Sequence, residues 1–347
     1  MKFKRTIMCT CAAAALAAGL GVGLANQEAV DAVWHNLTAF QLPMHAEAWT
    51  AGRELTRIPY AQDSDSQYLD LYLPEAEEEL PLFVMIHGGA FVFGDSQTRQ
   101  TQWMYRYFRD QGYVCATVNY RLAQEAPFPA AVEDAKAAVR FLKAHAGEYG
   151  IDPERVVIWG ESAGGYIASM AALSGDDAFM GVQYVGQQGQ GVSAKVNVLV
   201  DYYGAVEFGD MSQDYRALRI PLWIHKLANA GLHVKEMQQS GFSRFEDYFI
   251  RKKTSEMTPE ERAAYSPASY VSSLRPDELS VIIVHGDTDI TVPVLQSKRL
   301  EQALSSVLSP DRILAMYPHG RKHADDRLFT DAFLEQLDSQ IKAWLSE

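Results

Sequence analysis

Short apolar segments recur along the chain between residues 54 and 317, and turn residues bound each of them. The first two segments alternate apolar and polar positions, as a strand does when only one of its faces is buried. The later ones are nearly continuous apolar runs, which are typical of parallel strands covered on both faces. The pattern therefore predicts strands at residues 54–60, 68–73, 81–87, 113–119, 155–160, 195–201, 280–285 and 312–317.

Helical periodicity fills most of the intervals between these strands. It is found at residues 100–111, 129–146, 163–173, 293–306 and 328–345. Strands that alternate with helices indicate an α/β fold. We therefore predict a doubly wound, mostly parallel eight-stranded sheet with helices on both faces.

One long segment interrupts this alternation. Residues 206–270 are rich in Met and aromatic side chains, are mostly helical in pattern and contain no convincing strand. An insertion of this length between two strands usually covers a site, and we predict a helical cap there, with Phe208 and Trp223 binding substrate. The alternative is that these helices and side chains only pack on the sheet. With the predicted cap set apart, the core of the α/β fold comprises residues 26–205 and 271–347.

The N-terminus has the features of a secretory signal. Basic residues precede an apolar Ala/Gly-rich stretch over 7–24, and small residues follow at 23–25. We predict a cleaved signal peptide over residues 1–25 and a secreted or periplasmic protein. A retained anchor is the alternative. A lipoprotein is disfavoured, because Cys9 and Cys11 come too early and lack small residues just ahead of them.

Charge and cysteine content narrow the possible partners. The formal net charge is −13, and loss of the predicted signal peptide, which carries three positive charges and no negative ones, would make it −16. A protein with this net negative charge is repelled by nucleic acid and by anionic membrane surfaces. We therefore expect neither of them as a partner. After that cleavage Cys115 is the remaining cysteine, so we predict no intrachain disulfide. Because Cys115 lies within an apolar run, we predict that its side chain is buried and acts as a small hydrophobic residue.

A serine between small residues follows the fifth predicted strand. Gly160, Ser162 and Gly164 form the pattern G-x-S-x-G, with a strand before it and a helix after it. A strand-to-helix turn this sharp needs small flanking residues, because neighbouring backbone approaches closely. We predict that Ser162 is a nucleophile; the alternative is a tight turn with an inert serine.

A serine nucleophile needs hydrogen-bond donors for the anion that it generates. The stretch His87-Gly88-Gly89-Ala90 directly follows the third predicted strand, and its glycines allow backbone N–H groups to face a carbonyl oxygen. We predict that the N–H groups of Gly88, Gly89 and Ala163 form an oxyanion hole. His87 is predicted to be structural, because it precedes the serine and the expected chain order of the triad is Ser, acid, His.

The base is sought among the histidines that follow the serine. Two of these histidines fall in the predicted cap. His285 ends the strand at 280–285 and precedes the candidate acids of that segment, so its predicted role is local packing. His319 and His323 lie in the loop after the last predicted strand. We predict His323 as the base, because it lies in a polar loop just before a helix and can reach Ser162. His319 follows Pro318 and is predicted to be a turn residue.

The acid is predicted in the segment that follows the strand at 280–285. Asp287 and Asp289 lie two and four residues beyond His285. We favour Asp289, because its longer reach carries the carboxylate out of the strand toward the imidazole. Asp287 and Asp201, which ends the preceding strand, are the alternatives.

With these residues in place, the chain resembles the α/β-hydrolase superfamily, and within it the hormone-sensitive-lipase-like and related bacterial carboxylesterases. The resemblance extends over residues 54–345, and six segments carry it: HGGAFVFGD (87–95), NYRLAQEAPFPAAVEDAKAAVRFLKAH (119–145), YGIDPERVVIWGESAGG (149–165), DYYGAVEF (201–208), HGDTDITVPVLQS (285–297) and KHADD (322–326). It implies a nucleophile at Ser162, an acid at Asp289, a base at His323 and oxyanion glycines at Gly88 and Gly89.

Two segments depart from the lipase-like pattern. Ala90 stands where that branch usually has a third glycine, and in this the chain resembles carboxylesterase-type and plant-polymer esterases. The segment HGDTDITVP also resembles that of secreted prolyl-peptidase-type hydrolases. These departures leave the branch, and with it the substrate, open.

The sequence therefore predicts a secreted serine carboxylic-ester hydrolase. It would act on small or medium acyl groups, including esters linked to plant polysaccharide, through a Ser-His-Asp triad and an acyl-enzyme. No metal or organic cofactor is expected, since neither an H-E-x-x-H motif, nor paired-Cys spacing, nor a dinucleotide fingerprint occurs. The alternatives are a prolyl-peptidase-like serine peptidase or amidase and a non-catalytic binding module on a hydrolase fold.

Overall fold

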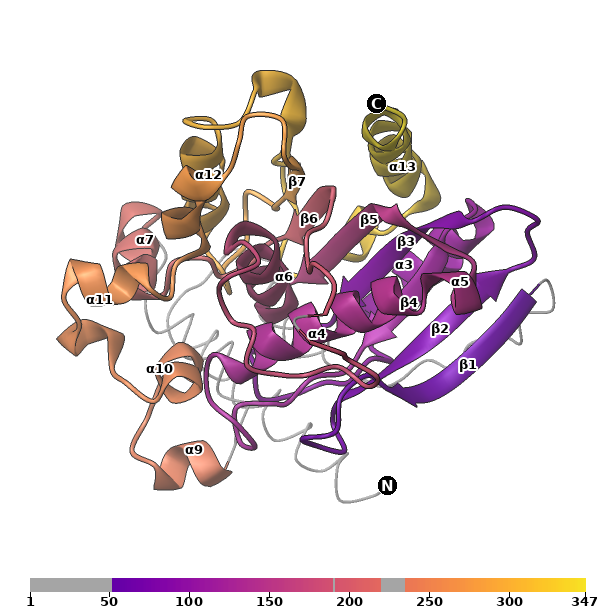
Figure 1. Cartoon of the computed structure of the whole chain (residues 1–347). Helices are drawn as coiled ribbons and strands as arrows, with labels where there is room; N and C mark the ends of the chain where they lie inside the picture. The colour runs from indigo at the N-terminus through magenta and orange to yellow at the C-terminus, as the bar shows by residue number, and fades with distance from the viewer. Residues whose placement is uncertain (1–51, 190, 220–234) are drawn as a thin grey trace, which may run out of the picture.

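A central sheet organises the chain in the computed structural model, which describes residues 52–189, 191–219 and 235–347 (Figure 1). Within these residues the sheet has eight strands in the order β1-β2-β4-β3-β5-β6-β7-β8. They are β1 (Gly52–Pro59), β2 (Tyr68–Pro74), β3 (Leu80–Ile86), β4 (Val114–Val118), β5 (Ile151–Glu161), β6 (Val198–Tyr202), β7 (Ser280–Val284) and β8 (Ile313–Met316). β2 runs antiparallel to both β1 and β4, and the other pairings are parallel.

Each predicted strand is present, with shifts of a few residues at the ends. The largest shift is at β5, which begins at Ile151 because Ile151 and Asp152 pair with Leu80 and Pro81 before the register changes. The alternating pattern of β1 matches its place at an edge, where most of its residues are exposed or half-buried. The apolar runs of β4, β6 and β7 are buried throughout, as expected for strands covered on both sides.

Two layers of helices cover the sheet (Figure 1). They are α3 (Arg99–Asp110), α4 (Ala130–Ala144), the short α5 (Ala146–Tyr149), α6 (Ala163–Leu173), α12 (Leu295–Leu304) and α13 (Asp331–Leu345). Apolar side chains of α3 and α13 share one core cluster with Phe83 and Met85 of β3. Leu82 and Val84 of the same strand join α4, α6 and α12 in the second cluster. Successive side chains of β3 therefore lie in the two opposite core clusters, because side chains alternate between the two faces of a strand.

The described part of the segment between β6 and β7 contains short helices joined by turns and no strand. Its elements are η1 (Phe208–Asp210), α7 (Met211–Ala217), α9 (Lys235–Gln239), α10 (Phe245–Ile250), η2 (Thr254–Glu256), α11 (Pro259–Ala263) and η3 (Pro267–Ser273). Asp214 of α7 accepts hydrogen bonds from Gln296 (2.6 Å) and Arg299 (2.9 Å) of α12. This buried contact attaches the start of the segment to the core. Trp223 lies outside the described residues.

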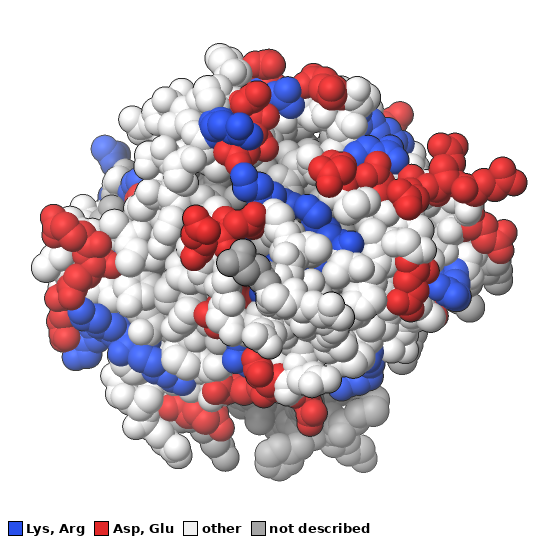
Figure 2. Space-filling model, in the orientation of Figure 1, with Lys and Arg blue, Asp and Glu red and all other residues white. Residues whose placement is uncertain are grey.

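Charged side chains of both signs cover the surface. On the face drawn in Figure 2, acidic residues are widely spread, with Lys and Arg interspersed among them. In the described part of the chain, no helix combines the length and the apolar character needed to cross a membrane.

Asp201, which lies near the end of β6, makes stability depend on pH. Its side chain is fully buried, and burial raises its pKa to about 7, opposed only by a hydrogen bond from the Gly204 amide (3.1 Å). The folded state therefore retains a proton that the unfolded chain releases above its ordinary value of 3.8. Stability contributed by this group is accordingly lost as pH rises from about 4 to about 7.

We expect Asp201→Asn to increase the free energy of unfolding at pH 8 by about 2–4 kcal/mol relative to wild type, and to change it much less at pH 4.5. Urea unfolding of the full chain at several pH values measures this difference. The exposed Asp277→Asn serves as a control. A difference between Asp201→Asn and wild type that is the same at every pH would contradict the assignment.

Candidate active site

Ser162 alone connects β5 to α6, and its backbone is strained (φ 54°, ψ −118°). A Cβ on Gly160 would lie 2.1 Å from the carbonyl oxygen of Gly164, and one on Gly164 would lie 2.1 Å from that of Ile86. Only glycine permits such close approach. The amide of Ser162 donates to the Tyr202 carbonyl (2.9 Å), which fixes the turn against β6. The turn therefore holds the serine at the carboxyl ends of the parallel strands, as the sequence predicted.

Two predicted partners lie next to the serine in series. His323 Nε2 is 3.0 Å from Ser162 Oγ, and His323 Nδ1 is 2.7 Å from Asp289 Oδ2. All three residues are buried. The other oxygen of Asp289 accepts the amides of Thr291 (2.8 Å) and Val292 (2.9 Å), which orients the carboxylate. Because Nδ1 faces a carboxylate, it carries the proton, and Nε2 is left to accept from the serine.

The rival candidates bind each other instead. His319 Nδ1 is 2.7 Å from Asp287 Oδ2, and Gly320 N–H donates to the other oxygen of Asp287 (2.8 Å). The His319 side chain is 95% exposed, so this pair lies at the surface. Asp201 is bonded to Gly204 in the interior. The structure thus brings His323 and Asp289 to the serine and leaves the three alternatives elsewhere.

The buried charges at this site shift one another's pKa values. Burial alone would lower the pKa of the His323 imidazole, but the Asp289 carboxylate, and after it Glu161, raise it above the ordinary value. Burial alone would raise the pKa of Asp289, yet His323 and His285 hold it well below its usual range. Asp289 therefore stays ionised and favours a proton on the imidazole.

The predicted oxyanion hole needs one correction. The Gly88 amide donates to Glu161 Oε1 (2.9 Å), so it is not available to a substrate oxygen. Gly89, Ala90 and Ala163 donate no backbone hydrogen bond to any described residue. Gly89 has a φ of +127°, which favours glycine there. Sequence reasoning included Gly88 because it could not see that the Glu161 side chain faces this amide.

Glu161 was missed as a site residue, although it directly precedes the nucleophile. Its side chain is buried, and burial raises the pKa of its carboxyl against the opposing effects of His323 and the Gly88 amide. Glu161 therefore acts on the site in two ways. Its hydrogen bond to Gly88 fixes the loop after β3, and its carboxylate is a second acidic group that acts on His323. In the sequence, its position directly before the serine of the G-x-S-x-G pattern could have indicated that Glu161 lies at the site.

His285 has more than the packing role predicted for it. Its Nδ1 accepts from Ser297 Oγ (2.7 Å), and its Nε2 lies 2.9 Å from the Val292 carbonyl and 3.3 Å from Asp289 Oδ2. The imidazole therefore supports the turn that presents Asp289. The spacing of four residues between His285 and Asp289 was the signal in the sequence.

Phe208, predicted to bind substrate, packs in an aromatic cluster. Its ring stacks on Tyr166 (centroids 4.5 Å apart) and meets the edges of Phe91 (5.7 Å) and Phe249 (6.3 Å). These contacts link it to α6 and to the loop after β3, but none of them is with the triad. Over the described ranges, no group of three or more His, Cys, Asp or Glu side chains is arranged to hold a metal ion.

Comparison with known proteins identifies the family of this chain. The profile of the BD-FAE family matches residues 69–304, which include Ser162 and Asp289. The chain belongs to the BD-FAE family. This membership agrees with the resemblance to α/β-hydrolase esterases found in the sequence.

Curated relatives of this BD-FAE protein include esterases. LipM of Mycobacterium tuberculosis, a probable carboxylic ester hydrolase, is 25% identical over 274 residues, 78% of this chain and 56% of the relative. Isoprenylcysteine alpha-carbonyl methylesterase ICME of Arabidopsis thaliana is 26% identical over 283 residues, 81% and 59% of the two chains. The chain thus spans somewhat more than half the length of these relatives.

Solved structures share the fold of this BD-FAE protein. A truncated form of a carbohydrate esterase from gut microbiota gives a TM-score of 0.65 at 21% identity, covering 86% of this chain and 98% of the other. Esterase Est2 of Thermogutta terrifontis, with propionate bound, gives 0.59 at 20% identity, covering 84% and 94%. These similarities support an α/β-hydrolase architecture.

We expect Glu161→Gln to lower the pKa of the His323 imidazole, because it removes a nearby negative charge. Glutamine retains an oxygen that can accept the Gly88 amide, so the loop should keep its position. NMR titration of the imidazole in the full chain measures the shift. Glu278→Gln, before β7 at the opposite end of that strand, should leave the pKa of His323 unchanged. An equal effect of both substitutions would exclude a direct interaction.

Proposed function

We propose that this chain is a serine carboxylic-ester hydrolase that works through an acyl-enzyme. The observation that carries the proposal is the continuous series from Ser162 Oγ through the His323 imidazole to the Asp289 carboxylate, with contacts of 3.0 and 2.7 Å. This arrangement supplies a nucleophile, a base and the group that orients the base. The esterases among the relatives support the same activity.

In the first half of the proposed reaction, Ser162 Oγ attacks the ester carbonyl carbon while its proton passes to His323 Nε2. Asp289 holds Nδ1–H and stabilises the imidazolium that forms. The carbonyl oxygen becomes an oxyanion, which accepts the unoccupied amides of Gly89, Ala90 and Ala163. When the tetrahedral intermediate collapses, the ester C–O bond breaks and His323 gives its proton to the departing alkoxide.

In the second half, water enters in place of the alcohol. His323 takes one proton from the water as its oxygen attacks the acyl carbon, and the oxyanion forms again at the same amides. Collapse breaks the bond to Ser162 Oγ, which recovers the proton from His323. A carboxylic acid leaves, and the triad returns to its starting protonation state, with a neutral imidazole and an ionised Asp289, without any cofactor.

The proposed substrates are esters of small or medium acyl groups, including those linked to carbohydrate. The support is indirect: the gut carbohydrate esterase shares the fold. We further propose that the helical segment 206–270 caps the site, because Phe249 of α10 stacks on Phe91 (4.1 Å) beside the predicted oxyanion loop. We also propose that residues 1–25 direct export of the protein. Export would bring the protein to polymer-linked esters outside the cell.

Ser162→Ala should abolish hydrolysis of p-nitrophenyl acetate, because alanine has no nucleophile, while the thermal unfolding temperature stays near that of wild type. We expect a loss of at least about a thousandfold in kcat. Release of p-nitrophenol by the purified full chain measures it. Activity retained by the variant would refute the proposal; an aminoacyl-anilide cleaved in place of the ester would indicate a peptidase.

The base is tested by a pair of substitutions in one loop. His323→Ala should lower kcat by about three or more orders of magnitude, because it removes the imidazole that lies 3.0 Å from the serine hydroxyl. His319→Ala, which removes an exposed imidazole from the same loop, should retain nearly full activity. The reverse ranking in a p-nitrophenyl acetate assay would show that the base is misassigned.

A further inference from the structure

Tyr203, which directly follows β6, has a strained backbone. Its φ of 43° lies in the left-handed region, where a bulky side chain is uncommon. Hydrogen bonds on both sides hold this conformation: the Tyr203 amide donates to the Val284 carbonyl (2.8 Å), and the Gly204 amide donates to the Asp201 carboxylate (3.1 Å). Glycine adopts this angle without strain, so tyrosine at this position indicates a function of its side chain.

The Tyr203 ring packs against the proposed base. Its centroid lies 4.8 Å from that of the His323 imidazole, with the two planes 61° apart, and both side chains are buried. The same ring lies 6.3 Å from His285, which supports the turn that presents Asp289. A ring in this place restricts rotation of the His323 imidazole, which has to keep one nitrogen toward Ser162 and the other toward Asp289.

The Tyr203 hydroxyl acts on a different group, the Glu161 carboxylate. Burial raises the pKa of Glu161, and His323, the Gly88 amide and the Tyr203 hydroxyl oppose that rise. The hydroxyl makes no hydrogen bond of ordinary length and angle to any residue that the structure describes, so its contact with Glu161 is a loose one. Glu161 in turn accepts the Gly88 amide (2.9 Å), which directly precedes the free amides of the predicted oxyanion loop.

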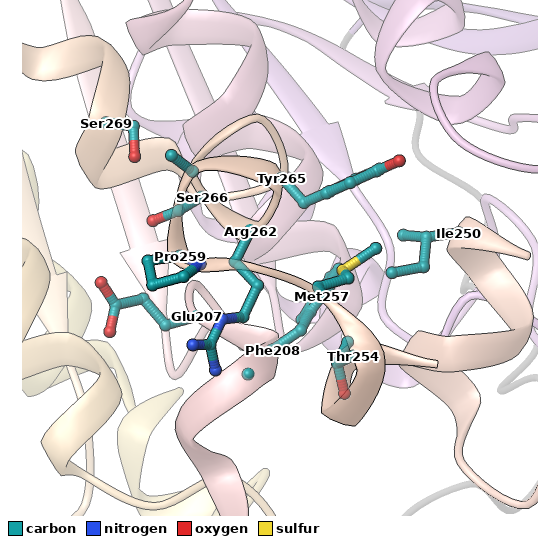
Figure 3. Close-up of a pocket in the computed structure, with 12 residues that line it drawn as sticks. Glu207, Phe208, Ile250, Thr254, Met257, Pro259, Arg262, Tyr265, Ser266 and Ser269 are labelled. Atoms are coloured by element: carbon teal, nitrogen blue, oxygen red, sulfur yellow. The ribbon is translucent and has the colours of Figure 1, made fainter. Parts of the chain in front are cut away.

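Tyr203 is enclosed by protein and does not meet a substrate. The residue is 0% exposed. It also does not line the pocket of about 210 Å³ within the helical segment, whose wall includes Phe208, Ile250 and Met257 (Figure 3). Any effect of Tyr203 on hydrolysis therefore acts through the two site residues that it contacts, His323 and Glu161.

We propose that Tyr203 is a positioning residue for ester hydrolysis. Its ring holds the His323 imidazole in line between Ser162 and Asp289. Its hydroxyl steadies Glu161 and, through Glu161, the loop of free amides. The kinetic effect rests on the proposed function, whereas the position of the imidazole does not depend on turnover.

The ring is tested with p-nitrophenyl acetate and the purified full chain. Tyr203→Leu should lower kcat about thirty- to a hundredfold and change KM less than about threefold, because a displaced base slows proton transfer more than it weakens binding. Tyr203→Phe keeps the ring and should restore kcat to within about fivefold of wild type. Tyr105→Leu is the matched control, because Tyr105 is also buried and its hydroxyl also lacks a hydrogen bond, but its ring stacks on Tyr72 (3.8 Å).

A spectroscopic measurement follows the imidazole itself. The proton that His323 Nδ1 shares with Asp289 gives a low-field proton NMR resonance, which His323→Ala identifies by removing it. This resonance should stay sharp in wild type, Tyr203→Phe and Tyr105→Leu, and should broaden or disappear in Tyr203→Leu. If Tyr203→Leu does not fold, as judged by its unfolding temperature, Tyr203→Met replaces it, since an unbranched side chain adapts to irregular space.

The hydroxyl is tested by combining two substitutions. If it acts through Glu161, the loss of kcat caused by Tyr203→Phe should be smaller when Glu161→Gln is already present. Equal losses in the two backgrounds would overturn the role of the hydroxyl.

The remaining outcomes decide the role of the ring. An unchanged resonance in Tyr203→Leu overturns it, as does a kcat near that of wild type. An equal loss in Tyr203→Phe or in Tyr105→Leu also overturns it, because the loss would then come from the hydroxyl or from general loosening of the core. A wild-type chain without esterase activity would refute the proposed function alone, and the resonance would still decide whether Tyr203 positions the imidazole.

Discussion

The contact between the backbones of Gly160 and Gly164 is the constraint on which the rest of the site depends. It allows β5 to pass into α6 through a single residue, so Ser162 has to adopt a left-handed backbone angle. The hydrogen bond from its amide to Tyr202 then ties that turn to β6. A Cβ at Gly160 would push β5 away from α6, and one at Gly164 would push α6 away from the end of β3, so in either case the hydroxyl would no longer face the imidazole.

A second constraint acts between two loops at the carboxyl ends of β7 and β8. The amide and hydroxyl of Thr288 both donate to the Arg321 carbonyl, and Gly286 packs closely against the same residue. This clamp keeps the loop that carries Asp289 beside the loop that carries His323. The outer His319–Asp287 pair joins the same two loops at the surface. Two similar His–Asp pairs thus bridge one junction, and burial distinguishes the one that reaches the serine.

The sequence predicted those parts of the molecule that depend on local pattern. Apolar runs located the strands, because each side of a buried strand needs its own apolar residues. Chain order narrowed the candidates for base and acid, and position within the two late loops then favoured His323 and Asp289. It did not predict the contact between Glu161 and Gly88, which arises from the parallel register of β3 beside β5. Nor did it predict the bonds of His285, since a histidine at a strand end has the same local pattern whether it packs passively or supports a turn.

The nucleophile and the base lie 161 positions apart in the chain, and the acid belongs to a third strand. A polypeptide that is still being translated, or is crossing a membrane unfolded, therefore contains an ordinary unactivated hydroxyl at position 162. Reactivity arises only when the last strand, β8, has joined the sheet and its loop has closed over the serine. Under the proposed mechanism, assembly of the sheet thus keeps acyl-transfer chemistry from cellular esters until folding is complete.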